Sequence, residues 1–158
     1  MTSVEKIQSE YEKDFYGWAM ANAKALSEQR FNEVDYEHII EELEDMGKNT
    51  YYQLENRLSV LIAHLLKWQY QPTHRPWDVS GKSWHLTIKE QRKRITDLLE
   101  DNPSLKSRIN KAITRGYKYA FAIIEKETPI DLETLPDACP YSFEQIIDRE
   151  FFPDNKGG

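Results

Sequence analysis

Apolar residues recur along the chain at spacings of three and four, the period of one face of an α-helix. The longest such run is Tyr51, Leu54, Leu58, Leu61, Leu65 and Trp68. It extends over about two and a half heptads, which is typical of a seam where one helix packs against its neighbours in a bundle. Pro72 follows the run, and a proline ring cannot continue a helix. The pattern therefore predicts a buried central helix that ends before residue 72.

Two stripes with the same spacing come before this helix. The first consists of Tyr11, Phe15, Trp18, Ala21 and Ala25, and predicts one helix. The second consists of Tyr36, Ile39, Ile40, Leu43 and Met46, with Asp35 in place to cap its N-terminus. The first stripe keeps its five residues near one helix face, and we expect the second stripe to face inward. Gly47 either breaks the second helix or lies inside a longer one that runs on into the central seam.

Two further helices are predicted after the central one. The stripe Trp84, Ile88, Ile95, Leu98 and Leu99 predicts a third main helix, which follows a loop at residues 71–82 and is capped by Ser80 or Ser83. The stripe from Leu105 to Ile123 predicts a fourth, which begins after a helix stop at Asn102 and Pro103. Gly116 and Ala120 lie four residues apart in this helix, so a neighbouring backbone could approach them closely.

The C-terminal part has a different character. Four of the seven prolines lie at positions 129–153, and Ser142 with Gln145 resembles the capping box of one short helix. We found no convincing strand pattern. The chain is predicted to be an all-α protein, a bundle of about four main helices with an ordered, mostly irregular C-terminal extension. We expect a single domain over residues 1–158, with the core bundle at about 10–127 and the extension at about 128–154.

Composition narrows the class of protein. Among 158 residues there is one cysteine, Cys139, which excludes an internal disulfide and a cysteine-based zinc site. The first residues lack the pattern of a signal peptide, and the longest apolar run is too short to span a bilayer. We therefore expect a soluble, cytoplasmic protein that does not associate with membranes.

Charge is distributed unevenly. Residues 33–45 contain seven acids and no lysine or arginine, whereas residues 82–118 have a net charge of +6, in a chain of net charge −6. We expect these two segments to offset each other through surface ion pairs, each worth about 0–1 kcal/mol. The alternative is a phosphate-binding face that includes Arg92, Lys93 and Arg94. Because the whole chain is acidic, we expect nucleic-acid binding to be weak at most.

The spacing of the histidines and carboxylates leads us to consider two kinds of metal site. Di-iron bundles need a Glu-x-x-His pair on each of two helices and two further glutamates, and here Asp35 and His38 form a single Asp-x-x-His. A three-histidine site would draw His38, His64 and His85 from three helices. Asp35, His38, His64 and His85 are therefore candidate ligands, and the alternative is that they are packed, cap-bonded or solvated. We expect no cofactor.

One pair of residues suggests catalysis. Arg57 and His64 lie seven residues apart, on one face of the predicted central helix. This spacing resembles the Arg-(four to six)-His element of HEPN-type ribonucleases, in which the two side chains act on the RNA 2′-hydroxyl and phosphate. Leu58 departs from that pattern, which more often has a polar residue there. The alternative is an arginine at the rim of the bundle beside a buried histidine.

The acids at positions 41–45 suggest a buried ion pair. Four acids among five residues repel one another if all are exposed, so we expect Glu41 or Glu42 to point inward. A buried carboxylate needs a cation. Arg92 is the first candidate, and Arg57 is the second. Such a pair would fix helix register, or it would orient His64 or a ligand.

Several segments resemble a known family. They are Asp14–Trp18, Glu41–Gly47, His64–Gln71, Trp84 with Ile88, Gln91 and Arg92, Pro103–Leu105, and Cys139–Tyr141. In this order the chain is similar to the bacterial family called domain of unknown function 29. The resemblance implies a helical bundle and no particular activity.

Two hypotheses about function follow. The first is a binding or scaffolding module that forms a homo-oligomer or binds a partner protein. The alternative is a hydrolase, either metal-dependent or a metal-independent ribonuclease. Its candidate catalytic residues are Glu41, Glu42, Arg57, His64 and Arg92.

Overall fold

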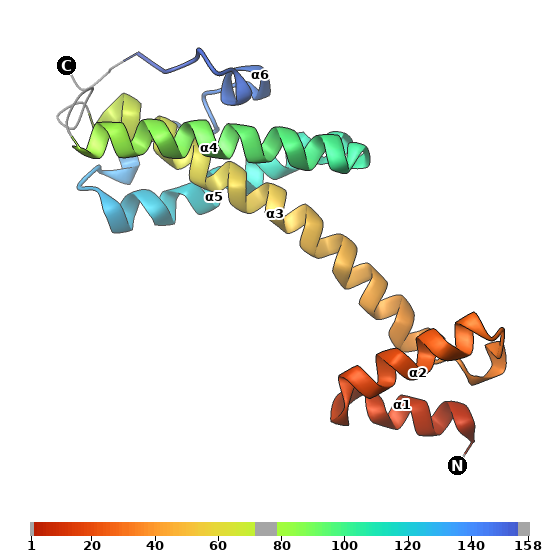
Figure 1. Ribbon diagram of the computed structural model, residues 1–158. Coiled ribbons are helices and arrows are strands. Elements are labelled where there is room, and N and C mark those ends of the chain that lie inside the picture. Colours follow the sequence, from red (N-terminus) through yellow and green to blue (C-terminus); the bar gives the residue numbers. More distant parts are fainter. Residues whose placement is uncertain (1, 72–78, 155–158) are drawn as a thin grey trace. The chain divides into compact units, whose positions relative to one another are not determined.

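The computed structural model describes residues 2–71 and 79–154, and none of these residues belongs to a β-strand. The chain forms two compact units, Met1–Asn49 and Thr50–Gly158. The long helix α3 (Tyr36–Tyr70) contributes residues to both (Figure 1). The predicted all-α class is confirmed. The prediction of a single domain stays a prediction.

The stripe from Tyr11 to Ala25, which predicted one helix, falls on two helices of the first unit. Helix α1 (Ser3–Lys13) and helix α2 (Phe15–Ser27) lie side by side and are followed by a short 3-10 helix, η1 (Phe31–Glu33). Asp14 separates α1 from α2. Its backbone leaves the helical conformation, and its Oδ1 accepts a hydrogen bond from the Gly17 N–H at 2.9 Å. The aspartate thus ends one helix and caps the next.

Helix α3 passes through Gly47 without a break, which confirms the longer of the two predicted helices. It ends at Tyr70, before Pro72, which lies outside the described residues together with the rest of positions 72–78. We predicted that five apolar residues in the first part of α3 face inward, and this prediction is wrong for four of them. Ile39 is half-buried, whereas the exposed side chains are Tyr36, Ile40, Leu43 and Met46.

The second unit has the predicted core. Leu54, Leu58, Leu61 and Leu65 of α3 are fully buried. They pack in one apolar cluster with residues of α4 (Val79–Asp101) and α5 (Ile109–Glu127), including Ile88, Ile95, Ala112, Ala120 and Ile124. Ser80 and Ser83 lie inside α4 and are not its caps, because the helix begins before them. A 3-10 helix, η3 (Pro103–Arg108), takes up the predicted first turn of α5.

The C-terminal extension is ordered and largely irregular, as predicted. It contains a 3-10 helix, η4 (Leu132–Thr134), and the short helix α6 (Phe143–Ile147). Both bonds of the capping box between Ser142 and Gln145 are present. Tyr141 and Ile146 insert into the core of the second unit.

No described helix is both long and apolar enough to cross a membrane.

Gly116 lets α5 approach α3 closely, as the sequence predicted. A Cβ atom at Gly116 would lie 3.3 Å from the carbonyl oxygen of Glu55, from Cβ of Leu58 and from the backbone nitrogen of Ser59. Two of these three atoms belong to the α3 backbone, which cannot move without shifting the helix. At Gly47, by contrast, a Cβ would meet no atom within 4 Å.

The two glycines give a matched pair of predictions. We expect Gly47→Ala to stabilise the protein by about 0.5–1 kcal/mol, because alanine has the higher helix propensity and the site is open. We expect Gly116→Val to destabilise it by about 1–3 kcal/mol, because the added methyl groups overpack the helix contact. Urea unfolding measures both effects. A stable Gly116→Val variant would contradict the close helix contact.

Candidate functional site

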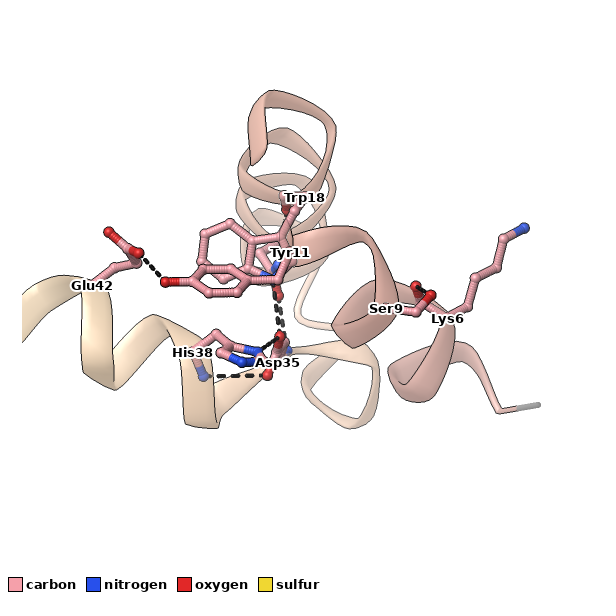
Figure 2. A network of polar contacts seen from close by, with 8 residues as sticks. Lys6, Ser9, Tyr11, Trp18, Asp35, His38 and Glu42 are labelled. Atoms are coloured by element: carbon pink, nitrogen blue, oxygen red, sulfur yellow. Dashed lines mark hydrogen bonds and ion pairs between the residues drawn. The ribbon is translucent and has the colours of Figure 1, made fainter. Parts of the chain in front are cut away.

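A buried carboxylate organises the first unit. Asp35 is fully buried, and its Oδ2 accepts a hydrogen bond from Nε1 of Trp18 at 2.9 Å and contacts Nδ1 of His38 at 2.6 Å. Its Oδ1 accepts from the His38 backbone N–H at 3.3 Å. The backbone N–H of Asp35 donates to Oδ1 of Asn22 at 2.8 Å. One side chain therefore caps α3 and ties it to α2 (Figure 2).

Helix α1 joins this network through one tyrosine. The Tyr11 ring stacks on the His38 ring, with centroids 4.0 Å apart and planes 13° apart. It also meets the edge of Trp18 at 4.8 Å. The Tyr11 hydroxyl donates to Oε1 of Glu42, one turn further along α3. Figure 2 shows the tyrosine lying over the histidine with its hydroxyl turned toward Glu42.

Hydrogen bonding shifts the pKa values of this network. Burial raises the pKa of Asp35, but the bonds from Trp18 and His38 outweigh burial, so the pKa is lowered. The bond to Asp35 raises the pKa of His38, which burial opposes only in part. The bond to Glu42 raises the pKa of Tyr11 to about 12. The protonated histidine and the ionised aspartate therefore stabilise each other.

We predict that the first unit is most stable between about pH 4 and pH 6.5. The raised pKa of His38 gives a contribution that is complete below the unfolded-state value of about 6.5 and is lost as the pH rises through the folded value. The lowered pKa of Asp35 gives a contribution that is present above about 3.9 and is lost as the pH falls through the folded value. Hydrogen exchange of residues 3–48 at a series of pH values measures this profile.

Two variants check the assignment of the profile. His38→Gln should abolish the loss of stability above pH 6.5 in the first unit. His64→Gln should leave that loss unchanged there. In the second unit, burial lowers the pKa of His64, so its contribution is complete above about pH 6.5, is lost as the pH falls below that value, and disappears in this variant. A first-unit profile that His38→Gln does not change would contradict the role of the Asp35–His38 pair.

The Asp35–His38 pair has the geometry of an oriented base, because the bond at Nδ1 leaves Nε2 as the outward nitrogen. A base also needs space for a substrate. The Tyr11 ring covers one face of the imidazole, and the cavity of about 320 Å³ in this unit is lined by α1, α2 and Glu33, not by His38. The network is therefore best described as the structural support of the N-terminal end of α3.

The outer side of α3 carries an uncovered apolar stripe. Tyr36, Ile40 and Leu43 follow one another at spacings of four and three, and are 49%, 54% and 61% exposed. We call these three side chains the α3 apolar face. A single exposed leucine is ordinary on a protein surface, but large apolar side chains gathered on one helix face mark an interaction site.

Arg57 and His64, the predicted catalytic pair, lie in the second unit, and each forms a hydrogen bond within the chain. Arg57 donates to the Gln91 side chain at 3.4 Å. Nδ1 of the half-buried His64 is 2.8 Å from the carbonyl oxygen of Val60. Glu55, the acid nearest to Arg57 in sequence, pairs with Arg115 at 3.2 Å. The role of Arg57 and His64 in catalysis stays a prediction.

The predicted ion pair between Arg92 and Glu41 or Glu42 is replaced by other contacts. Arg92 is 3% exposed, and its guanidinium donates to the carbonyl oxygens of Gln145, Ile146 and Phe151. Glu42 accepts from Tyr11, and Glu41 is exposed. Backbone carbonyls of the C-terminal extension thus take the place of the carboxylate expected for Arg92.

Two bases of α4 pair with acids of the same helix. Lys93 pairs with Asp97 at 2.9 Å, and Arg94 pairs with Glu90 at 2.9 Å, both within the helix. The expected offset between residues 33–45 and the basic segment stays a prediction. A cleft of about 970 Å³ lies between α4 and the C-terminal extension, and its lining carries both signs of charge. The proposed phosphate-binding face thus has acids beside its bases.

The candidate metal ligands are distributed over both units. Asp35 and His38 bond to each other, and His85 stacks on Phe152 at a centroid distance of 5.1 Å. Among the residues that the structure describes, no group of three or more histidine, cysteine or acidic side chains has the arrangement of a metal site. The half-buried thiol of Cys139 is free, and burial raises its pKa.

The fold and these contacts define an all-helical protein with a packed C-terminal extension and an exposed apolar helix face. The chain belongs to the family described as Domain of unknown function DUF29, whose model matches residues 10–152. The resemblance noted in the sequence is thereby confirmed. No curated protein and no solved structure matches the chain. The family description assigns no activity.

Proposed function

We propose that this protein is a protein-binding module and that the α3 apolar face is its binding surface. The observation that carries the proposal is the change of burial along one stripe. Tyr36, Ile40 and Leu43 are exposed, whereas the leucines at 54, 58, 61 and 65, which repeat the same spacing, are fully buried by α4 and α5. Burying the first three against a partner would complete the apolar contact of the helix.

The chemistry of the face suits helix recognition. Side chains at i, i+4 and i+7 are the anchors by which a helix contacts an apolar groove or a second helix. A tyrosine adds a large ring with few rotatable bonds, the type of residue enriched at binding hot spots. Gly47 follows Leu43 four residues later and has open space around it, so a partner's backbone could approach the helix there.

The support beneath the face favours binding. Tyr36 follows Asp35 directly, and the Asp35 carboxylate fixes the first turn of α3 through Trp18 and His38. A preorganised surface loses little conformational entropy on association. We keep the cytoplasm as the proposed location of the module, because a chain with one cysteine has no internal disulfide that needs an oxidising compartment.

Site-specific crosslinking tests the proposal. A photoreactive residue is introduced at Ile40 of the full chain in cells, and the matched control carries it at Lys118, an exposed position of α5. We expect a discrete protein adduct from position 40, lost when Leu43→Asp is added, and no such adduct from position 118. Absence of an adduct at position 40, or identical adducts from both positions, would overturn the proposed function.

A further inference from the structure

A row of glutamates runs beside the α3 apolar face. Glu37, Glu41 and Glu44 each follow one of its apolar residues directly in sequence, so they repeat the same spacing of four and three. On an α-helix this places them about 100° around the axis, as a second stripe along the edge of the first. All three are exposed. We call them the glutamate row.

Among the described residues, no lysine or arginine forms an ion pair with the glutamate row, and His38 interacts with Glu37 and Glu41 only at longer range. Within the described part of the first unit, the ion pairs are those of Arg30 and His38, and none involves Glu37, Glu41 or Glu44. Helix α4 shows the other arrangement, because Lys93 and Arg94 each pair with an acid one turn away on the same helix. The carboxylates of the row are therefore available to cations from outside the unit.

We infer that the partner of the α3 apolar face is a basic amphipathic helix, an inference that rests on the proposed function. Its apolar stripe would cover Tyr36, Ile40 and Leu43, and a flanking row of lysines or arginines would pair with the glutamate row. Residues along one side of a helix pair are the positions where charges select partner and orientation.

The charge of the whole unit favours this partner over a second copy of the chain. Residues 1–49 contain 12 acids and 5 bases, a net charge of −7, and residues 50–158 have a net charge of +1. Self-association through the face would bring two units of −7 together, and repulsion would oppose it. A basic partner is instead attracted from a distance, with an association rate that falls as salt rises.

The test measures binding of a designed peptide to the full chain by fluorescence anisotropy. The probe is a helical peptide with leucines at a/d spacing and a flanking row of lysines, and its control has glutamates in place of the lysines. The protein variants are Glu37→Gln, Glu41→Gln and Glu44→Gln combined, and separately Leu43→Asp. The matched control combines Glu12→Gln, Glu125→Gln and Glu133→Gln, which removes three exposed charges elsewhere.

We expect the lysine peptide to bind and the glutamate peptide not to bind. The glutamate-row triple variant should raise Kd about tenfold, as three surface ion pairs predict, and flatten its dependence on salt. The control triple variant should leave Kd within about twofold of the wild type, and Leu43→Asp should abolish binding.

The outcomes separate the two proposals. If the lysine peptide binds equally well to the row variant and to the wild type, or if both triple variants weaken it equally, the inferred basic helix is wrong. If position 40 crosslinks in cells but the lysine peptide does not bind, the proposed function stands and the inference fails. An adduct of two copies of this 18.7 kDa chain, abolished by Leu43→Asp, also overturns the inference in favour of a homo-oligomer. If neither experiment detects binding, both proposals fail.

Discussion

Replacing Asp35 with alanine is expected to destabilise the Met1–Asn49 unit by about 3–5 kcal/mol, the cost of breaking a buried polar network. The substitution removes the cap of α3, which alone is worth about 1 kcal/mol. It also leaves the indole N–H of Trp18 and the Nδ1 of His38 without their acceptor. A buried donor that loses its partner costs about 1–3 kcal/mol.

The loss of stability is expected in the first unit alone, so it has to be measured for each unit separately. Hydrogen exchange should show the loss at residues 3–48, with the exchange of residues 54–66 and 112–124 little altered, because the two units have separate interiors. Asp45→Ala is the control, since Asp45 is exposed on the same helix and should change stability by less than about 0.5 kcal/mol. A loss below about 1 kcal/mol for Asp35→Ala would show that the carboxylate does not hold the unit together.

The second unit could be predicted well because its helices are long and their apolar spacing is regular. The run from Tyr51 to Trp68 is buried as the periodicity indicated. The contact at Gly116 and the capping box at Ser142 depend on one or two residues of known geometry. In each case the physical cause is local or periodic, so it is visible in the sequence.

The break between α1 and α2 was missed although its signal is present. Apolar spacing passes through Asp14 without interruption, because two consecutive helices can bury residues in the same register. The signal is the aspartate itself, three residues before Gly17, whose N–H it accepts. Asp competes for backbone donors and favours caps over helix interiors, so capping should have outweighed periodicity here.

The exposed face of α3 shows a limit of periodicity. A stripe such as Tyr36, Ile40 and Leu43 indicates that one side of a helix avoids water, but it does not say whether the same chain or another molecule covers that side. The sequence indicated only part of the Asp35 network. Asp35 and His38 lie one turn apart in sequence, whereas Tyr11 reaches them through tertiary packing, which no spacing encodes.

Arg92 was expected to meet a carboxylate, and its three acceptors are backbone carbonyls. Every residue has a carbonyl oxygen, so no residue type in the sequence indicates which carbonyls an arginine will contact. Two of the three, those of Gln145 and Ile146, belong to the last turn of α6, which is only five residues long. The last carbonyls of a helix lack partners within it, and a cation there also interacts favourably with the helix dipole.

Arg92→Ala is expected to destabilise the second unit by about 3–5 kcal/mol, the range for losing two or three buried hydrogen bonds to a charged group. Nε donates to Ile146 at 2.7 Å, and one terminal nitrogen donates to Phe151 at 2.7 Å and to Gln145 at 3.3 Å. The guanidinium also lies over the Phe152 ring at 5.3 Å. Removing it leaves carbonyls without donors and detaches the C-terminal extension from α4.

Urea unfolding and limited proteolysis together test this role. The Arg92→Ala variant should be cleaved rapidly at residues 142–154, while α3 and α5 remain resistant. Arg92→Lys keeps the charge but not the planar fork that reaches several carbonyls at once, so we expect an intermediate loss. Arg94→Ala is the matched control, because Arg94 is exposed and pairs only with Glu90 on its own helix. Equal stability of the Arg92→Ala and Arg94→Ala variants would mean that the extension is held by its apolar contacts alone.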